Sequence, residues 1–368
     1  MIHIRTGAVI GLRLFDVCAS VDLAIAAEEL KAAPSERRVT VSIRTTRRIA
    51  SIFRRSALPL RLELGKRSFD LDGAPATAGL SIDIYDYGTI AVLAEVSVPD
   101  GAAIDEARRL VRATYESEEL TELARAEVER VRERLTRSTR DEHDWRKAQS
   151  YAVLFLQDAS PRAVLAWDGL PALLAGDAHD GVPSEDTRAD VRTYSESHYD
   201  NDLVSIGSRA ALVVDPSGSR ELLDLIQFAL SQLLQLRYYD EVLDRELAQL
   251  RSEFARGGRR TLALFRSYGL LVRDAGRRFV EITAFTERID NSLKVLGDDY
   301  SARVYDKATD RLGLLLLKDS VATKQRLVTE MVEVFAHEAE SLRSLILEIT
   351  IVLLIVTEII LAFAVPGH

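Results

Sequence analysis

The sequence has few of the residues that build disulfide frameworks, metal centres and common catalytic sites. It has one cysteine, Cys18, among 368 residues, which excludes an internal disulfide and a thiolate-rich zinc site. It has no Gly-x-x-x-x-Gly-Lys-Ser/Thr loop, no Gly-x-Gly-x-x-Gly, no His-Glu-x-x-His and no Gly-x-Ser-x-Gly. The six histidines are scattered. We therefore expect a reducing compartment, no metal, no cofactor, no small-molecule substrate, and a binding role rather than an enzyme.

The rest of the composition is that of a globular protein. Hydrophobic residues make up 47% of the chain and charged residues 29%, which excludes a disordered chain and a protein with many membrane spans. The length allows two domains and a sizeable core.

The first 216 residues mix strand and helix patterns. Every second residue is apolar in Ile90–Val98, which is typical of a strand with one face on a core. Helices are expected from about Ile104 and over Leu120–Leu135, and Leu203–Val214 predicts a further strand. We therefore expect an α+β fold, with a mixed α/β cytoplasmic domain over residues 1–216.

Long helices are expected over residues 217–343. Apolar residues follow a 4-3 spacing from Leu222 to Phe254, which predicts an antiparallel helical stalk with coiled-coil-like packing. Asp240 breaks this seam, and a carboxylate there has to be paired or hydrogen-bonded. Candidate partners on facing helices are Arg278, Arg288 and Arg303. We expect a buried pair of Asp240 with Arg288 that fixes helix register, and a ligand site at Asp240 is the alternative.

The C-terminal residues predict a membrane-spanning helix. From Leu345 to Val365 there is no Lys or Arg, and only four residues are not apolar. Twenty-one helical residues span about 32 Å, close to the thickness of a bilayer core. The positive charges before this run, Arg343 among them, keep the preceding residues in the cytoplasm. We therefore expect a tail-anchored, single-pass protein of the cytoplasmic (inner) membrane with its anchor over residues 344–366, and a buried core helix is the alternative.

Polar residues inside the expected span are Glu348, Thr357 and Glu358, together with Thr350. Glu358 falls beyond the midpoint, where an ionised carboxylate costs roughly a few kcal/mol, so it should be neutral, paired or facing another helix. Thr350 and Thr357 are seven residues apart on one helix face and can hydrogen-bond across a helix–helix contact. This favours a homo-oligomer over an ion pathway.

Positive charge is concentrated in one stretch. Residues 37–67 contain ten Lys or Arg and one acid, Glu63, while the whole chain has a net charge of −9. A basic segment in an acidic protein suits an anionic partner, either RNA or anionic lipid head groups. The expected anion-binding residues are Arg44, Arg47, Arg48, Arg54 and Arg55. The alternative is a surface that the protein's own acids neutralise.

Several segments resemble one known family. They are Tyr85–Ile90, Asn201–Val204, Ala210–Pro216, Leu236–Asp240, Arg288–Leu296, Tyr300–Tyr305 and Leu347–Glu358. In this order they resemble the family of the sporulation protein "required for meiotic nuclear division", a domain of unknown function found from bacteria to mitochondria. The resemblance implies a mixed α/β domain, a helical region and a C-terminal anchor. It also implies a link to translation, because a mitochondrial member supports the mitochondrial ribosome, and it transfers no catalytic residue.

These observations lead to one expected function and two alternatives. We expect a non-enzymatic, membrane-tethered scaffold that holds a macromolecular partner, the ribosome or RNA, at the cytoplasmic face of the membrane. One alternative is a small-molecule sensor or enzyme with a site around Asp240. The other is a structural homo-oligomer.

Overall fold

The computed structural model describes residues 2–32, 40–43, 59–178, 181–256, 276–287 and 299–364. The chain divides into two compact units. The first unit consists of Met1–Tyr238 and Thr283–Lys318, and the second unit of Tyr239–Ile282 and Asp319–His368. The expected boundaries at residues 216 and 343 stay a prediction.

A nine-stranded sheet is the centre of the first unit. Its strand order is β11-β12-β13-β10-β2-β7-β6-β5-β4, antiparallel throughout except for the parallel pair β10–β13. Two short pairs, β1–β8 and β3–β9, lie outside it. The strands are β1 His3–Ile4, β2 Gly7–Asp16, β3 Cys18–Val21, β4 Thr40–Ile43, β5 Leu60–Leu71, β6 Ala74–Ile84, β7 Thr89–Ser97, β8 Ala102–Ala103, β9 Thr139–Glu142, β10 Ala148–Leu156, β11 Ser195–Glu196, β12 Leu203–Ile206 and β13 Ala210–Val214.

The described helices differ widely in length. They are α1 Leu23–Ala32, α3 Ile104–Glu116, α4 Glu118–Arg132, α5 Pro161–Leu165, α6 Leu170–Ala175, α7 Glu185–Thr193, α8 Glu221–Arg256, α10 Asp299–Arg311 and α11 Leu314–Ala364. Residues 276–287 are helical as well. Helix α8 contributes its first half to the first unit and its second half to the second unit.

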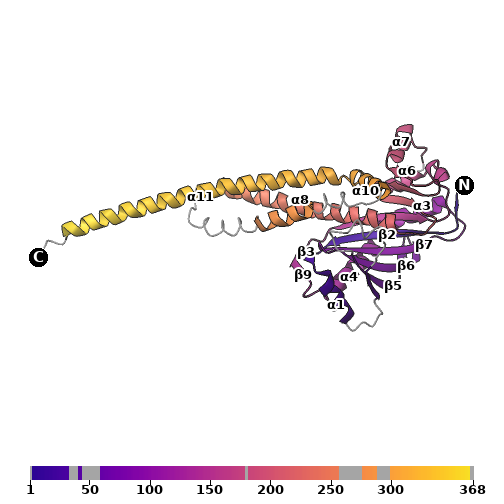
Figure 1. The fold of residues 1–368 in the computed structure, drawn as a ribbon, viewed down its shortest axis with the longest axis horizontal. Helices are drawn as coiled ribbons and strands as arrows, with labels where there is room; N and C mark the ends of the chain where they lie inside the picture. The colour runs from indigo at the N-terminus through magenta and orange to yellow at the C-terminus, as the bar shows by residue number, and fades with distance from the viewer. Residues whose placement is uncertain are drawn as a thin grey trace. The chain divides into compact units, whose positions relative to one another are not determined.

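The sheet lies between two helical layers because its side chains alternate. Ile82 and Ile84 of β6 pack with Ala124 and Val128 of α4 on one face. The residue between them, Asp83, reaches α8 on the opposite face. Figure 1 shows the first half of α8 running alongside the strands. The alternation of side chains along β6 therefore gives the sheet an apolar face towards α4 and a partly polar face towards α8.

The turn between β6 and β7 requires glycine. Gly88 has a φ of 87°, in the left-handed region. Its backbone N–H donates a hydrogen bond of 3.1 Å to the carbonyl oxygen of Tyr85. A Cβ atom at this position would lie 1.7 Å from the carbonyl oxygen of Cys18. Any side chain here would therefore push the hairpin away from the start of β3.

Arg13 is a buried cation that is held by carbonyl groups. Its guanidinium donates to the carbonyl oxygens of Thr114, Tyr115 and Ser117, at 2.7 to 3.2 Å, and to the Thr121 hydroxyl at 2.7 Å. These carbonyls lie at the C-terminus of α3, where the helix dipole is negative. Burial lowers the pKa of Arg13 to about 10. The side chain therefore fixes the corner between α3 and α4 on strand β2.

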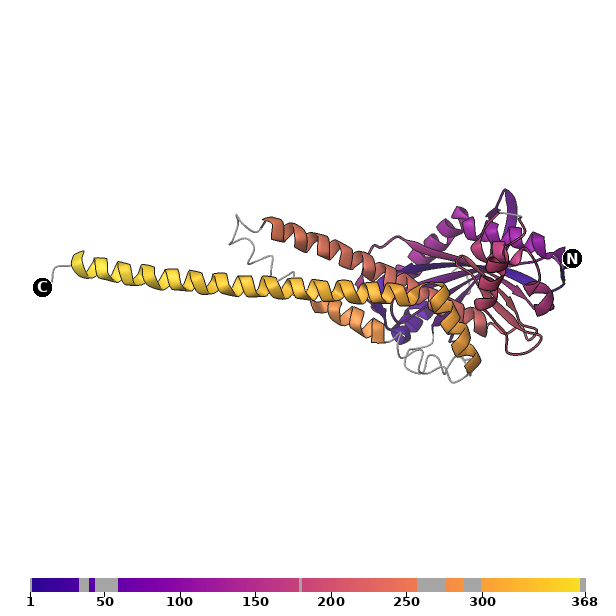
Figure 2. The ribbon, with the colours of Figure 1, turned by 90° about the horizontal axis from the view of Figure 1, so that it is seen from above.

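The second unit consists of long helices. Its parts are the second half of α8, the helical residues 276–287 and most of α11. Leu243, Ile282 and Val328, one from each, are buried. Figure 2 shows α11 as one unbroken helix, and its 51 residues make it the longest element of the described chain.

The expected transmembrane anchor over residues 344–366 is wrong. Among the described residues, no helix is both long enough and apolar enough to cross a membrane. The apolar run is the end of the longer helix α11, whose earlier turns are charged, and Glu348 and Glu358 interrupt the run itself. The prediction of a tail-anchored, single-pass protein of the cytoplasmic membrane falls with it. The fold is a mixed α/β structure with long helices.

Candidate functional site

A line of buried polar side chains joins the sheet to α8, and we call it the polar row. On α8 it consists of Gln227, Ser231 and Gln235, at most 2% exposed. A spacing of four residues places these three side chains on one helix face. On the sheet side it consists of Asp16, Arg61, Asp83, Tyr85 and Tyr87.

At one end of the polar row is a buried ion pair. Arg61 donates two hydrogen bonds to Asp83, one of them at 2.5 Å. The Gln227 amide donates to Asp83 Oδ2 and to the Tyr85 hydroxyl, both at 2.9 Å. Burial alone would lower the pKa of Arg61, but the hydrogen bonds and charge of Asp83 outweigh it and raise that pKa. Burial also raises the pKa of Tyr85. Both residues therefore keep their protons at neutral pH.

At the other end, a carboxylate meets a histidine. The distance between Asp16 Oδ2 and His143 Nε2 is 3.3 Å, and the Gln235 amide lies 3.4 Å from Asp16 Oδ1. The His143 ring stacks on Tyr238 with 4.1 Å between ring centres. Burial raises the pKa of Asp16, against hydrogen bonding to His143 that lowers it. Between the two ends, the hydroxyl groups of Tyr87 and Ser231 are 2.6 Å apart.

The chemistry of the polar row is that of a structural contact. Its charged groups lie against one another and are closed to solvent. The nearby Cys18 is buried, and burial followed by the charges of Asp16 and Glu142 raises its pKa to about 12, so it is a thiol at neutral pH. The geometry therefore holds α8 in one register on the sheet.

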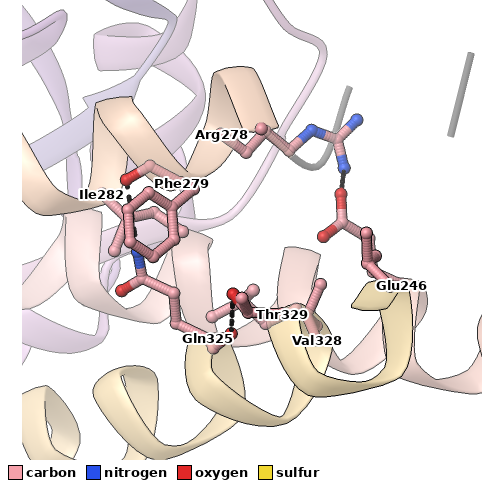
Figure 3. A pocket seen from close by; sticks show the side chains of 10 residues that line it. Glu246, Arg278, Phe279, Ile282, Gln325, Val328 and Thr329 are labelled. Atoms are coloured by element: carbon pink, nitrogen blue, oxygen red, sulfur yellow. Dashed lines mark hydrogen bonds and ion pairs between the residues drawn. The ribbon is translucent and has the colours of Figure 1, made fainter. Parts of the chain in front are cut away.

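The second unit contains an open, mostly apolar cavity of about 220 Å³. Its lining residues come from α8, residues 276–287 and α11, and they are Leu243, Glu246, Gly276, Arg278, Phe279, Ile282, Gln325, Val328, Thr329 and Val332. Figure 3 shows Glu246 and Arg278 facing each other at one side and Phe279 beside Gln325 at the other. Glu246 and Arg278 form an ion pair, and the Gln325 amide donates to the Phe279 carbonyl at 3.2 Å. These two polar contacts therefore lie at the edges of a cavity whose remaining lining is mostly apolar.

Comparison with known proteins gives a family for the first unit. Residues 6–220 match the family model of the uncharacterized protein MJ0711, N-terminal domain. The chain belongs to this family. The matched residues end one position before α8 begins, so the polar row joins the MJ0711 N-terminal domain to the first helix beyond it. No curated protein and no solved structure matches the chain.

The resemblance to the "required for meiotic nuclear division" family is wrong. The family model that matches is that of the MJ0711 N-terminal domain, over residues 6–220. Most of the segments that carry the resemblance lie after residue 220, in helical sequence such as Leu236–Asp240 and Tyr300–Tyr305. Apolar seams of long helices recur in unrelated proteins, because they encode packing.

Asp240 has its partners on α11. Lys324 Nζ lies 2.8 Å from Asp240 Oδ1, and the Ser320 hydroxyl donates to the same oxygen at 3.0 Å. Asp240 is not among the residues that line the cavity. Arg288 lies outside the described residues, so the pair of Asp240 with Arg288 stays a prediction.

The other two candidate arginines have partners of their own. Arg278 pairs with Glu246 at the cavity, and Arg303 of α10 pairs with Glu196 of β11. The sequence pattern identified Asp240 as a seam carboxylate, but it could not select among several cations on facing helices.

The expected anion-binding arginines lie outside the described residues, namely Arg44, Arg47, Arg48, Arg54 and Arg55. Two described members of the same basic stretch are used within the fold. Arg61 is buried against Asp83, and Arg67 Nε lies 3.7 Å from Glu127 Oε1. At these two described positions, the cations are therefore used within the fold.

The residues expected inside a membrane belong to the last turns of α11. Glu348, Thr357 and Glu358 are exposed. The Thr357 hydroxyl donates to the Leu353 carbonyl of its own helix. Their expected intramembrane role is wrong, because no described helix fits a membrane span. Across the described part of the chain there is no cluster of three or more His, Cys, Asp or Glu that could hold a metal ion.

Sequence reasoning missed the polar row and the cavity. The signal for the row was present: Gln227, Ser231 and Gln235 recur every four residues beside the apolar seam. Their partners lie more than 140 residues away in the sequence, so local periodicity could not find them. The cavity depends on how three helices pack and has no local sequence signature.

Proposed function

We propose that this chain is a non-enzymatic scaffold that binds a protein partner through the cavity of its second unit. The observation that carries the proposal is the open, apolar cavity framed by the Glu246–Arg278 pair. Apolar surface that stays open to solvent marks interaction sites and ligand grooves.

The size and lining of the cavity favour a side chain over a small molecule. Its volume of about 220 Å³ is below the roughly 300–1,000 Å³ of ordinary ligand sites. Phe279 is 45% exposed at its edge, which offers an aromatic contact to an incoming residue. The Arg278 side chain is 37% exposed and can pair with an acid of the partner. The expected partner segment therefore has a large apolar residue next to an acidic one.

The first unit supports a non-enzymatic role. The buried ionisable groups of the polar row bind one another, and none of them lines the cavity. The thiol of Cys18 is protonated at neutral pH, because its pKa is raised to about 12. Nucleophilic catalysis requires the opposite shift, towards a thiolate.

Protein is favoured over RNA as the partner. RNA binding requires free cations along a surface, and the described part of the basic stretch contains the buried Arg61 and the paired Arg67. The cavity offers one aromatic ring, Phe279, and one cation, Arg278, which pairs with Glu246. Its lining therefore does not form the row of cations and stacking rings that follows a nucleic-acid strand.

Site-specific photo-crosslinking tests the proposal. A photoreactive phenylalanine analogue is placed at Phe279, which lines the cavity, or at Val280, which is 66% exposed on the same helical segment but does not line it. In cells that produce the protein, we expect a discrete protein adduct from position 279 and none from position 280. Filling the cavity with Val328→Phe or, separately, Val332→Phe should abolish the adduct while circular dichroism stays unchanged. An adduct with RNA, equal adducts at both positions, or an adduct that survives both filled cavities would contradict the proposal.

A further inference from the structure

We call residues 314–339 of α11 its proximal half and residues 340–364 its distal half. The distal half exposes an unusual amount of apolar surface. Ten large apolar residues between Leu347 and Ile360 are 47% to 64% exposed. Exposed apolar residues are ordinary when single, but a contiguous set of this kind marks an interaction surface. The set begins beyond the cavity, whose last lining residue is Val332, so it is a separate surface.

Four of the exposed residues continue the packing seam of the proximal half. Val321 and Val328 are buried and Val332 is half-buried, and Val328 and Val332 line the cavity with Leu243 and Ile282. Four heptads later, the same seam positions hold Ile349, Val356 and Ile360, and Leu353 lies between them. The distal seam therefore repeats the register in which the proximal half packs against helices.

The polar residues of the distal half lie off this seam. With Leu353 and Ile360 at heptad position a and Ile349 and Val356 at position d, Glu348 falls at c and Glu358 at f. Both positions face away from the partner in a coiled coil. Thr350 and Thr357 fall at e, at the edge of the seam. No charge would be buried if helices packed along it.

The side-chain shapes along the seam select the number of helices. Leu or Ile at a with β-branched residues at d favours three or four strands over two. The neighbouring g positions hold Val352 and Ile359, which are 55% and 51% exposed and would be covered in such a bundle. A second copy of the chain supplies a matching seam automatically, because identical layers meet when the copies are related by cyclic symmetry.

We propose that three or four copies of this chain assemble through the distal half of α11, as a parallel bundle with Ile349, Leu353, Val356 and Ile360 in its core. Cyclic symmetry around an axis along α11 makes the helices parallel and closes the assembly. Glu348 and Glu358 stay at the outside in every copy. The proposal does not depend on the cavity or on its partner.

The mass of the full-length protein in solution tests the assembly. Light scattering should give three or four times the chain mass of 41.0 kDa. Leu353→Glu places a carboxylate in the core and should reduce the mass to that of one chain. Leu354→Glu is the matched control, because Leu354 is equally exposed at 64% but lies at the outer position b, and it should leave the mass unchanged. A wild-type mass of one or two chains, or equal loss in both variants, would overturn the proposal.

Cysteine crosslinking tests the orientation. In a parallel bundle, Ile349→Cys and Ile360→Cys should each form a disulfide with the same position in a neighbouring copy under mild oxidation. An antiparallel pair would instead join position 349 to position 360 in a mixture of the two variants, and that result would overturn the parallel arrangement. The native Cys18 does not interfere, because it is buried and its pKa is raised to about 12.

Discussion

The first half of α8 and the distal half of α11 distribute polarity in opposite ways. On α8, Gln227, Ser231 and Gln235 are polar and almost fully buried. On α11, residues such as Leu353 and Leu354 are apolar and more than half exposed. Buried polar groups cost free energy unless they are paired, so they are found where one arrangement has to be fixed. Exposed apolar groups cost free energy until they are covered, so they are found where a partner binds.

The comparison suggests that the two units have different roles, one structural and one in binding. The first unit, which contains the MJ0711 N-terminal domain, is a closed frame whose polar row fixes the entry of α8. The second unit carries two accessible apolar surfaces, namely the cavity and the distal seam of α11. The predictions below test how the polar row fixes the first unit and whether the two units differ in packing and in binding.

The largest effect is expected from breaking the ion pair of the polar row. Asp83→Ala removes the hydrogen-bonded counter-charge of the buried Arg61 and leaves only Asp224, whose Oδ1 lies 3.8 Å from Arg61 Nη2. This should lower the free energy of unfolding by about 3–5 kcal/mol. Chemical denaturation followed by circular dichroism measures this loss. Replacing both partners, as Arg61→Met with Asp83→Leu, should recover most of it. Asp144→Ala removes an exposed acid of the same type and should cause no measurable loss. If both single variants behave alike, the polar row does not fix the frame.

The next effect compares the two cores directly. Leu230→Ala in the first unit removes a fully buried side chain and should cost about 2–5 kcal/mol. Leu243→Ala on the same helix removes a side chain that already borders an open cavity, so its cost should be at the low end, about 2 kcal/mol. The same denaturation experiment measures both values. A larger loss for Leu243→Ala would mean that the second unit, and not the first, is the tightly packed frame.

The smallest effect concerns the pH dependence of Asp16. Burial raises the pKa of Asp16 in the folded state, so this state holds its proton at higher pH than the unfolded chain does. The stability that this group contributes is complete below its unfolded pKa of about 3.9 and is lost as the pH rises through the folded pKa. The free energy of unfolding of Asp16→Asn, measured with urea, should therefore increase relative to that of the wild type as the pH is raised from 4 to 7.5.

Asp144 provides a control of opposite sign for this pH experiment. A hydrogen bond from Arg146 and its charge lower the pKa of Asp144. Stability from such a group is present above the unfolded pKa and is lost as the pH falls through the folded pKa. Asp144→Asn should therefore show no gain between pH 4 and pH 7.5. A gain of equal size in both variants would show that net charge, and not the burial of Asp16, governs the trend.

Parts of this fold could be predicted from local sequence. The alternation in residues 90–98 predicts strand β7, and the 4-3 seam from Leu222 predicts α8, which the structure has as one helix to Arg256. Both patterns repeat over many neighbouring residues, so they do not depend on distant contacts. The polar row could not be predicted in this way, because Gln227 meets Asp83 across 144 residues of sequence.

The C-terminus shows how a length criterion can mislead. An apolar run of 21 residues satisfies the length of a membrane span, but the criterion ignores the helix to which the run belongs. The structure has a 51-residue helix that is charged in its earlier turns, with Glu348 and Glu358 exposed further on. The seam at Ile349, Leu353, Val356 and Ile360 becomes visible only when the register of the proximal half is known.

The most direct test of the central claim compares crosslinking from the two units in cells. A photoreactive residue at Phe279 reports on the cavity of the second unit, and one at Tyr199, which is 64% exposed, reports on the surface of the first unit. The account predicts a discrete protein adduct from position 279 and none from position 199. An adduct from position 199 with none from position 279 would contradict it, because binding would then belong to the α/β frame.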